Sequence, residues 1–218
     1  MSIIIGIDGP AGSGKGTITK LVAKKLNLVN IDTGAMYRAI AYATLKNNIE
    51  ITDADKIVEL SKKVDITFDE DGNIFLDGEN ISDKIRTKEV SSVVSQISSI
   101  VELRKNMVNL QKKMAEGKNV IMEGRDITTV VFPNADFKFY LDASVEERAN
   151  RRYKQNQELN IEMSYDEILE NIKTRDYNDM HKEVGALKRT EEQIYIDTTN
   201  LEIEEVVNLI IKHIKGEI

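Results

Sequence analysis

A glycine-rich stretch near the N-terminus, Gly9-Pro-Ala-Gly-Ser-Gly-Lys-Gly-Thr17, constrains the fold of this chain more than any other feature. It follows a β-branched apolar run, Ile3 to Ile7, that predicts a buried strand, and it precedes residues 18–26, where apolar side chains recur at helical spacing. In a strand–loop–helix unit of this kind, backbone N–H groups surround phosphate oxygens and the lysine, here Lys15, reaches the outer phosphates. The stretch therefore predicts a nucleotide phosphate site on an α/β fold.

One position inside this stretch departs from the general phosphate-loop pattern. That pattern has Ser or Thr directly after the lysine as a magnesium ligand, whereas here Gly16 follows Lys15 and the hydroxyl comes at Thr17. The Gly-Lys-Gly-Thr form resembles the loop of nucleoside monophosphate kinases. We therefore expect no metal ligand from the protein itself, with Mg²⁺ held mainly by phosphates and waters, which suits an ion that keeps several of its waters.

Length and composition limit the class of protein. The 218 residues, 41% of them hydrophobic, suffice for one sizeable α/β domain but not for two. A net charge of −7 argues against a nucleic-acid polymer or an anionic membrane as partner, since such binders carry an excess of Lys and Arg. Cysteine is absent, and the N-terminal apolar run lacks a basic flank and is broken at Asp8. We therefore expect neither a signal peptide nor a membrane span, and a cytoplasmic protein.

The remaining sequence alternates between strand and helix patterns. Apolar runs predict further strands at residues 28–31, 119–122, 137–141 and 193–196, and helical periodicity predicts helices after residue 32 and at 89–114 (with a second helix from about 101), 145–153, 165–182 and 203–214. Residues 64–85 instead alternate apolar and polar side chains between hairpin turn signals, so they predict a small antiparallel β insert. The polar residues 156–163 predict a loop.

Charged residues follow the predicted strands where a ligand site should lie. Arg38 comes soon after the second strand, and Arg125-Asp126 follows the third. Arg175 and Asp179 are spaced to share one helix face. Ligands of open α/β sheets bind at the carboxyl ends of the strands, which favours a site here. Taken locally, each of these residues also fits a solvated surface charge or a weak surface ion pair.

Several separate blocks of the sequence match one enzyme family in the same order. They are Ile7-Asp-Gly-Pro-Ala-Gly-Ser-Gly-Lys-Gly-Thr17, Asp32-Thr-Gly-Ala-Met-Tyr-Arg38, Ile85-Arg-Thr-Lys-Glu-Val90, Gly124-Arg-Asp126, Thr129-Val-Val-Phe-Pro133, Ala143-Ser-Val-Glu-Glu-Arg148, Arg175-Asp176 and Ile196-Asp-Thr-Thr199. Through them the chain resembles the bacterial-type cytidylate kinases over essentially its whole length. The resemblance implies a five-stranded parallel sheet flanked by helices, with an acceptor-binding insert and a mobile lid. Within one kinase domain, 1–218, the core would be about 1–60, 115–150 and 190–218, the insert about 61–114 and the lid about 151–189.

The resemblance also implies a reaction and its residues. The γ-phosphoryl group of ATP would pass to CMP or dCMP with Mg²⁺, in a monomer. ATP would be bound by Gly9, Pro10, Ala11, Gly12, Ser13, Gly14, Lys15, Gly16 and Thr17, and by Arg148 and Arg152 of the lid region, where Arg151 is a further candidate. On the acceptor, Arg38, Arg125 and Lys182 would meet the phosphate, Ser95, Arg104 and Asp126 the cytosine, and Arg175 and Asp179 the sugar, while Thr33 and Tyr37 would line the pocket. The catalytic cations would be Lys15, Arg38, Arg125, Arg175 and Lys182.

Two positions depart from the family pattern, and two other functions stay open. Lys182 stands where arginine is usual, and Gly185-Ala-Leu-Lys188 replaces a segment that usually contains proline. One alternative is a small phosphate-loop kinase for UMP, AMP or a non-nucleotide hydroxyl, against which Asp126 argues, because a carboxylate accepts from the amine of cytosine but not from the carbonyl of uracil. The other is a nucleotide-binding regulator without turnover, which would not need a second basic site.

Overall fold

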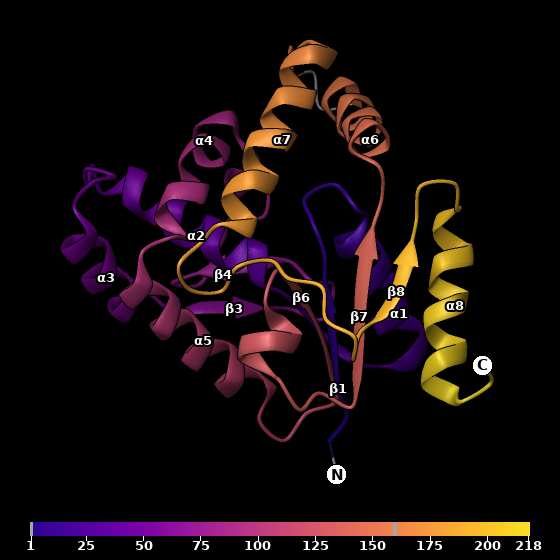
Figure 1. Ribbon diagram of the computed structural model, residues 1–218. Helices are drawn as coiled ribbons and strands as arrows, with labels where there is room; N and C mark the ends of the chain where they lie inside the picture. The colour runs from indigo at the N-terminus through magenta and orange to yellow at the C-terminus, as the bar shows by residue number, and fades with distance from the viewer. Residues whose placement is uncertain (1, 159–160) are drawn as a thin grey trace.

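A five-stranded parallel sheet forms the centre of the molecule in the computed structural model, which describes residues 2–158 and 161–218. Its strands are β1 (Ile4–Asp8), β2 (Val29–Asp32), β6 (Val120–Gly124), β7 (Phe137–Asp142) and β8 (Ile194–Asp197), in the order β2-β6-β1-β7-β8 (Figure 1). All neighbouring pairs are parallel. The predicted α/β class and its five strands are confirmed, with boundaries that differ by one or two residues.

Helices cover both faces of this sheet because its central strands are apolar on both sides. On β6, Ile121 packs with α1 (Lys15–Leu26) and α8 (Ile203–Lys215), whereas Val120 and Met122 pack into the cluster that includes α2 (Thr33–Lys46). That second cluster also contains α3 (Ala54–Lys63), α4 (Lys88–Ile97) and α5 (Val101–Ala115). The predicted helices are present; α3 was not predicted, although Asp53 caps it by accepting a hydrogen bond from the N–H of Lys56.

The predicted antiparallel insert is confirmed as a small three-stranded sheet. It comprises β3 (Ile66–Phe68), β4 (Ile74–Leu76) and β5 (Glu79–Asn80), followed by the 3₁₀ turn η1 (Lys84–Arg86). Ile66, Ile74 and Leu76 are buried in the same cluster as α2. The insert therefore packs on the core of the domain, beside the helices that carry the acceptor-site residues.

Two helices, α6 (Val145–Glu158) and α7 (Tyr165–Met180), stand together above the carboxyl end of the sheet (Figure 1). Ala149, Ile168 and Ile172 form a small apolar core between them. The predicted loop at 156–163 is wrong at its start, because 156–158 complete α6; residues 159–160 lie outside the described residues. Within the described parts of the chain, no helix has the length and hydropathy to cross a membrane.

Candidate active site

The glycine-rich loop connects β1 to α1 through backbone conformations that favour glycine. Gly14 is the N-cap of α1 with φ +86, and a Cβ on Gly9, at φ +152, would lie 2.0 Å from the carbonyl oxygen of Leu141. Lys15 begins the helix, and its Nζ donates to the carbonyl oxygen of Pro10 at 2.7 Å and to Ser13 Oγ at 3.3 Å. The loop thus holds its lysine inward, at a helix N-terminus suited to an anion.

The position of Lys15 disfavours its charged form. Only 4% of the residue is exposed. Burial and the nearby Arg125 guanidinium lower the pKa of Lys15 to about 7, against a smaller opposing effect from Glu123. A bound polyanion would remove this penalty by supplying the missing negative charge.

The base of the α6–α7 pair is fastened to the phosphate loop through Arg148. Its Nη1 donates to the carbonyl oxygen of Ala11 at 3.1 Å, and its guanidinium makes two hydrogen bonds to Asp176 of α7, at 3.0 and 2.6 Å. A Cβ on Gly12 would lie 3.1 Å from Arg148 Cβ. In this arrangement Arg148 links three segments of the fold, and its contact with ATP stays a prediction.

The other two arginines of α6 point to different neighbours. Arg151 donates to Glu147 and to both Oγ1 and the carbonyl oxygen of Thr198, in the loop after β8. Arg152 donates to Gln155, and burial together with Arg86 lowers its pKa. Arg152 in turn contributes, after burial, to the lowered pKa of Arg38. Arg152 therefore lies on the side of the acceptor phosphate cations, whereas its predicted role toward ATP is untested.

Two carboxylates lie beside the phosphate loop at matched positions of neighbouring strands. Asp32, at the end of β2, caps α2 by accepting from the N–H of Ala35, and it is in register with Glu123 at the end of β6. Burial and Asp32 raise the pKa of Glu123 to about 7. A Cβ on Gly16 would lie 2.9 Å from Glu123 Oε1. Gly16, which stands where a hydroxyl residue is usual, thus makes room for Glu123. The sequence analysis did not assign Glu123 to the site, although an acidic residue near the end of a buried strand was a signal for it.

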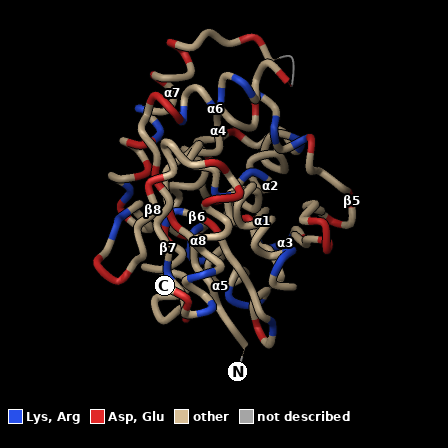
Figure 2. The backbone as a smooth tube through the Cα atoms, turned by 90° about the vertical axis from the view of Figure 1, so that its right-hand side faces the viewer, with Lys and Arg blue, Asp and Glu red and all other residues tan. Residues whose placement is uncertain are grey.

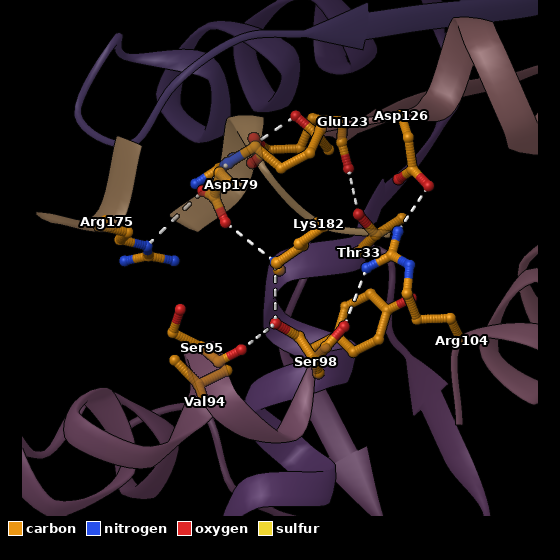
Figure 3. A pocket seen from close by; sticks show the side chains of 14 residues that line it. Thr33, Val94, Ser95, Ser98, Arg104, Glu123, Asp126, Arg175, Asp179 and Lys182 are labelled. Atoms are coloured by element: carbon orange, nitrogen blue, oxygen red, sulfur yellow. Dashed lines mark hydrogen bonds and ion pairs between the residues drawn. The ribbon is translucent and has the colours of Figure 1, made fainter. Parts of the chain in front are cut away.

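A single pocket brings together every residue predicted to bind CMP except Arg38. Its lining comprises Thr33, Gly34, Tyr37, Val94, Ser95, Ser98, Arg104, Glu123, Gly124, Arg125, Asp126, Arg175, Asp179 and Lys182 (Figure 3). These residues come from α2, α4, α5, the end of β6 and α7 with the segment after it. Arg38 donates to the carbonyl oxygen of Ile85 and to Ser91 Oγ, which ties α2 to the insert and to α4.

At one end of the pocket Arg104 and Asp126 form a buried ion pair. Arg104 Nη2 donates to Asp126 Oδ2 at 2.5 Å, and Nη1 donates to the carbonyl oxygen of Ser98 at 3.1 Å. The guanidinium carbon lies 5.3 Å from the centre of the Tyr37 ring. Arg125, the neighbour of Asp126 in the chain, turns instead to Asp179 of α7, so the ion-pair partner of Asp126 is Arg104.

At the other end Asp179 is surrounded by cations. Arg125 Nε donates to Oδ2 at 2.7 Å, Lys182 Nζ donates to Oδ1 at 2.9 Å, and Arg175 Nε lies 4.0 Å from Oδ2. Burial raises the pKa of Asp179, but Arg125 and then Lys182 outweigh it and leave the pKa well below its usual range. Lys182 also donates to Ser98 Oγ at 3.1 Å, a contact that sequence reasoning missed. The side chains of Asp179 and Lys182 are buried and those of Arg125 and Arg175 are half-buried, so this is not a fully solvated helix face.

Around this end of the pocket the cations outnumber the carboxylates, and the positive charges repel one another. Burial and then Arg152 lower the pKa of Arg38 to about 10, and burial and then Arg125 lower the pKa of Arg175. Such repulsion is relieved by an anion bound between them. The site therefore combines a phosphate loop, a second anion site and a polar Arg–Asp pair, which suits a phosphorylated small molecule with a hydrogen-bonding ring.

Comparison with known proteins agrees with this geometry. The family model described as "Cytidylate kinase" matches residues 5–216. Curated cytidylate kinases from Fusobacterium nucleatum and Bacillus subtilis are 49% and 44% identical, covering 98% and 97% of this chain and 98% and 96% of those proteins.

Solved structures support the fold at lower sequence similarity. A shikimate kinase from Bacteroides thetaiotaomicron superposes with a TM-score of 0.50 at 15% identity, covering 98% of both chains. At that identity the likeness concerns the fold alone. The sequence matches, in contrast, extend over the phosphate loop, the acceptor pocket and the segments between them, so the chain belongs to the cytidylate kinase family.

Proposed function

We propose that this protein transfers the γ-phosphoryl group of ATP to CMP or dCMP, giving ADP and CDP or dCDP, with its two nucleotide sites on either side of Lys15 and Arg125. The observation that carries the proposal is the pocket itself, where the buried Arg104–Asp126 pair and the cations around Asp179 lie at opposite ends of one cavity. That separation matches a nucleotide whose base and phosphate are both recognised.

Phosphoryl transfer of this kind needs charge and alignment rather than a covalent intermediate. Lys15 would follow the phosphoryl group from donor to acceptor, since its ammonium lies at the loop that faces ATP and within electrostatic reach of Arg125. Arg38, Arg125 and Lys182 would hold the acceptor phosphate. Arg175 would neutralise charge beside them, with Asp179 keeping Arg125 and Lys182 in place until the nucleotide arrives.

The base would be read at the Arg104–Asp126 end. Asp126 Oδ2 is used by Arg104, and Oδ1 makes no hydrogen bond within residues 2–158 and 161–218. A free carboxylate oxygen accepts from the exocyclic amine of cytosine and repels the carbonyl that uracil has at that position. Ser95 lines the same pocket, and Tyr37 offers a ring face beside the guanidinium.

Mg²⁺ fits the carboxylate side of the phosphate loop. The space that a side chain at position 16 would fill is bordered by Glu123, and Asp32 lies next to Glu123 in register, so two carboxylates lie beside the phosphate loop. We assign Asp32 and Glu123 to hold waters of the ion, in keeping with an ion bound mainly through phosphates and waters. When bound, Mg²⁺ would neutralise charge on the donor phosphates.

Residues of about 151–189, which include most of α6, all of α7 and the segment after it, would act as the lid of a single kinase domain. Arg148, just before this range on α6, contacts the phosphate loop on the ATP side, and α7 carries Arg175 and Asp179 toward the acceptor. Closure of such a lid would exclude water that otherwise hydrolyses ATP. The residues assigned to the two nucleotides lie around one pocket and the loop beside it, so a second copy of the chain is not needed to complete the site, and we propose a cytoplasmic monomer.

A coupled ADP-release assay tests the assignment. Wild-type protein with ATP and Mg²⁺ is given CMP, dCMP, UMP, AMP and shikimate, and we expect kcat/KM for CMP or dCMP to exceed the others. The Asp126→Asn variant should lose about 5- to 150-fold in kcat/KM for CMP, while UMP falls less or rises, because an amide turns either a donor or an acceptor to the base. An unchanged CMP-to-UMP ratio would remove Asp126 from base recognition.

A further inference from the structure

Gly185 touches the Arg104–Asp126 pair more closely than any side chain could. A Cβ at this position would lie 2.1 Å from Arg104 Nη2 and 2.2 Å from Asp126 Oδ2. Those two atoms are the donor and acceptor of the 2.5 Å hydrogen bond in the pair. A methyl group would therefore enter the bond itself, so that either the pair separates or the backbone at residue 185 withdraws.

The backbone at residue 185 is not free to withdraw, because it is fastened on both sides. Before it, Lys182 is bound to Asp179 and to Ser98. After it, the N–H of Leu187 donates to the carbonyl oxygen of Asp179 at 2.8 Å, and Leu187 is buried. Gly185 also has φ +70, the left-handed region that glycine adopts at no steric cost. The segment is held down on the pair from both ends.

We infer that Gly185 is a positioning residue for base selection: its bare backbone closes on the Arg104–Asp126 pair and fixes which carboxylate oxygen remains for the base. With Oδ2 held by Arg104 under Gly185, Oδ1 alone is left to accept from the nucleotide. The carbonyl oxygen of Ser98 restrains the other side of the guanidinium. The inference rests on the proposed role of Asp126 as the residue that reads the base.

The test compares Gly185→Ala with Gly117→Ala. Gly117 has φ +69, nearly the same backbone conformation, but a Cβ there meets nothing within 4 Å. Both variants place alanine at nearly the same positive φ, and they differ in the contact with the pair. For Gly185→Ala we expect KM for CMP to rise about tenfold and the CMP-to-UMP ratio of kcat/KM to fall at least about fivefold, with KM for ATP unchanged. Gly117→Ala should keep all three values.

A second pair of variants guards against simple misfolding. Asparagine tolerates the left-handed region better than alanine but still has a Cβ, so Gly185→Asn has less backbone strain and keeps the collision. We expect Gly185→Asn to unfold at a higher urea concentration than Gly185→Ala and to show the same loss of CMP selectivity, with Gly117→Asn as its control. If folded Gly185→Ala or Gly185→Asn protein keeps the wild-type KM for CMP and the wild-type ratio, the inference is wrong.

The Asp126→Asn variant separates this inference from the assignment of the base-reading residue. If Asp126→Asn lowers the CMP-to-UMP ratio and Gly185→Ala does not, the role of Gly185 alone is overturned. If Asp126→Asn leaves the ratio unchanged, Asp126 does not read the base, and the inference about Gly185 is wrong as well. The double variant should show less than the product of the two single effects, since both changes act on one pair; independent effects would contradict a role through that pair.

Discussion

At the scale of single residues, the site contains buried ionisable groups whose pKa values are shifted from their ordinary values. Lys15 is an ammonium with its pKa lowered to about 7, and Glu123 is a carboxyl with its pKa raised to about 7. Both shifts come first from burial, which disfavours the charged form of either group. Nucleotide and metal ion supply the opposite charges, so binding should change the protonation of the site.

Replacing Lys15 tests its place in the transition state. Lys15→Met should reduce kcat by roughly 10³-fold, because a phosphate clamp of this kind stabilises charge that develops during transfer. CMP affinity, measured by calorimetry, should change little. The exposed Lys20 on the same helix provides the control, since Lys20→Met should keep full turnover. A Lys15→Met variant with a tenth of wild-type kcat would exclude the residue from the mechanism.

The lowered pKa of Lys15 predicts proton uptake when ATP binds. Because pH 8 is above the Lys15 pKa of about 7, the amine is mostly neutral in the free protein at that pH. The phosphates of ATP raise that pKa, so the amine takes up a proton on binding. Calorimetric titration without Mg²⁺ at pH 8, in buffers with different enthalpies of ionisation, should give a net uptake that is reduced in Lys15→Met. Equal observed enthalpies in all buffers would contradict the shift.

At the scale of elements, the helix pair α6–α7 depends on a buried ion pair as well as on its small apolar core. Arg148 and Asp176 are 3% and 8% exposed, and they join the two helices to each other and to the phosphate loop. Among residues 2–158 and 161–218, Ala149, Ile168 and Ile172 form the buried part of the apolar core between the helices, so this core is small. Loss of one charge should therefore affect both the stability of the pair and the ATP side of the site.

Asp176→Asn measures that dependence. Removing one partner leaves the Arg148 charge buried without compensation, which costs about 3 to 5 kcal/mol in the free energy of unfolding. Urea denaturation followed by circular dichroism checks the value, and KM for ATP should rise because Arg148 also holds Ala11. The exposed pair Lys105–Glu102 gives the control, for which Glu102→Gln should change stability by less than about 1 kcal/mol. Equal losses for the two variants would contradict a structural role for the buried pair.

At the scale of the whole molecule, the charge is distributed unevenly between surface and interior. The chain carries a net charge of −7, and Figure 2 shows acidic and basic segments interspersed, with no continuous basic face in that view. The cations instead converge on the space between the sheet and the α6–α7 pair. The free protein therefore retains an internal repulsion that an anion relieves.

This distribution predicts selective stabilisation by polyanions. Pyrophosphate near saturation should raise Tm by at least about 4 °C through binding to the native state alone. Sodium chloride at the same ionic strength screens charges but does not fill the site, so its effect should be smaller. Differential scanning fluorimetry gives both values, and Lys15→Met should lose part of the pyrophosphate effect. An equal rise with chloride would mean that general screening, rather than a bound anion, accounts for the change.

The sequence by itself determined the order of elements and the chemistry of the ends of the strands. Hydrophobic periodicity depends on local residues, so the five parallel strands, most of their helices and the antiparallel insert were predictable; α3, the last residues of α6 and the short helical segments Lys84–Arg86 and Ile127–Val131 were not predicted. The phosphate loop was predictable because its glycines act through their own backbone angles. Family resemblance then supplied the acceptor-site residues, and nearly all of them line one pocket.

Only the tertiary structure decided which charges meet. Adjacent Arg125 and Asp126, which directly follow β6, point to different partners, Asp179 and Arg104. The contact of Gly185 with the Arg104–Asp126 pair joins segments far apart in the chain, as does that of Gly16 with Glu123. Such contacts depend on how the sheet, the insert and α7 pack together, and no local pattern contains that information.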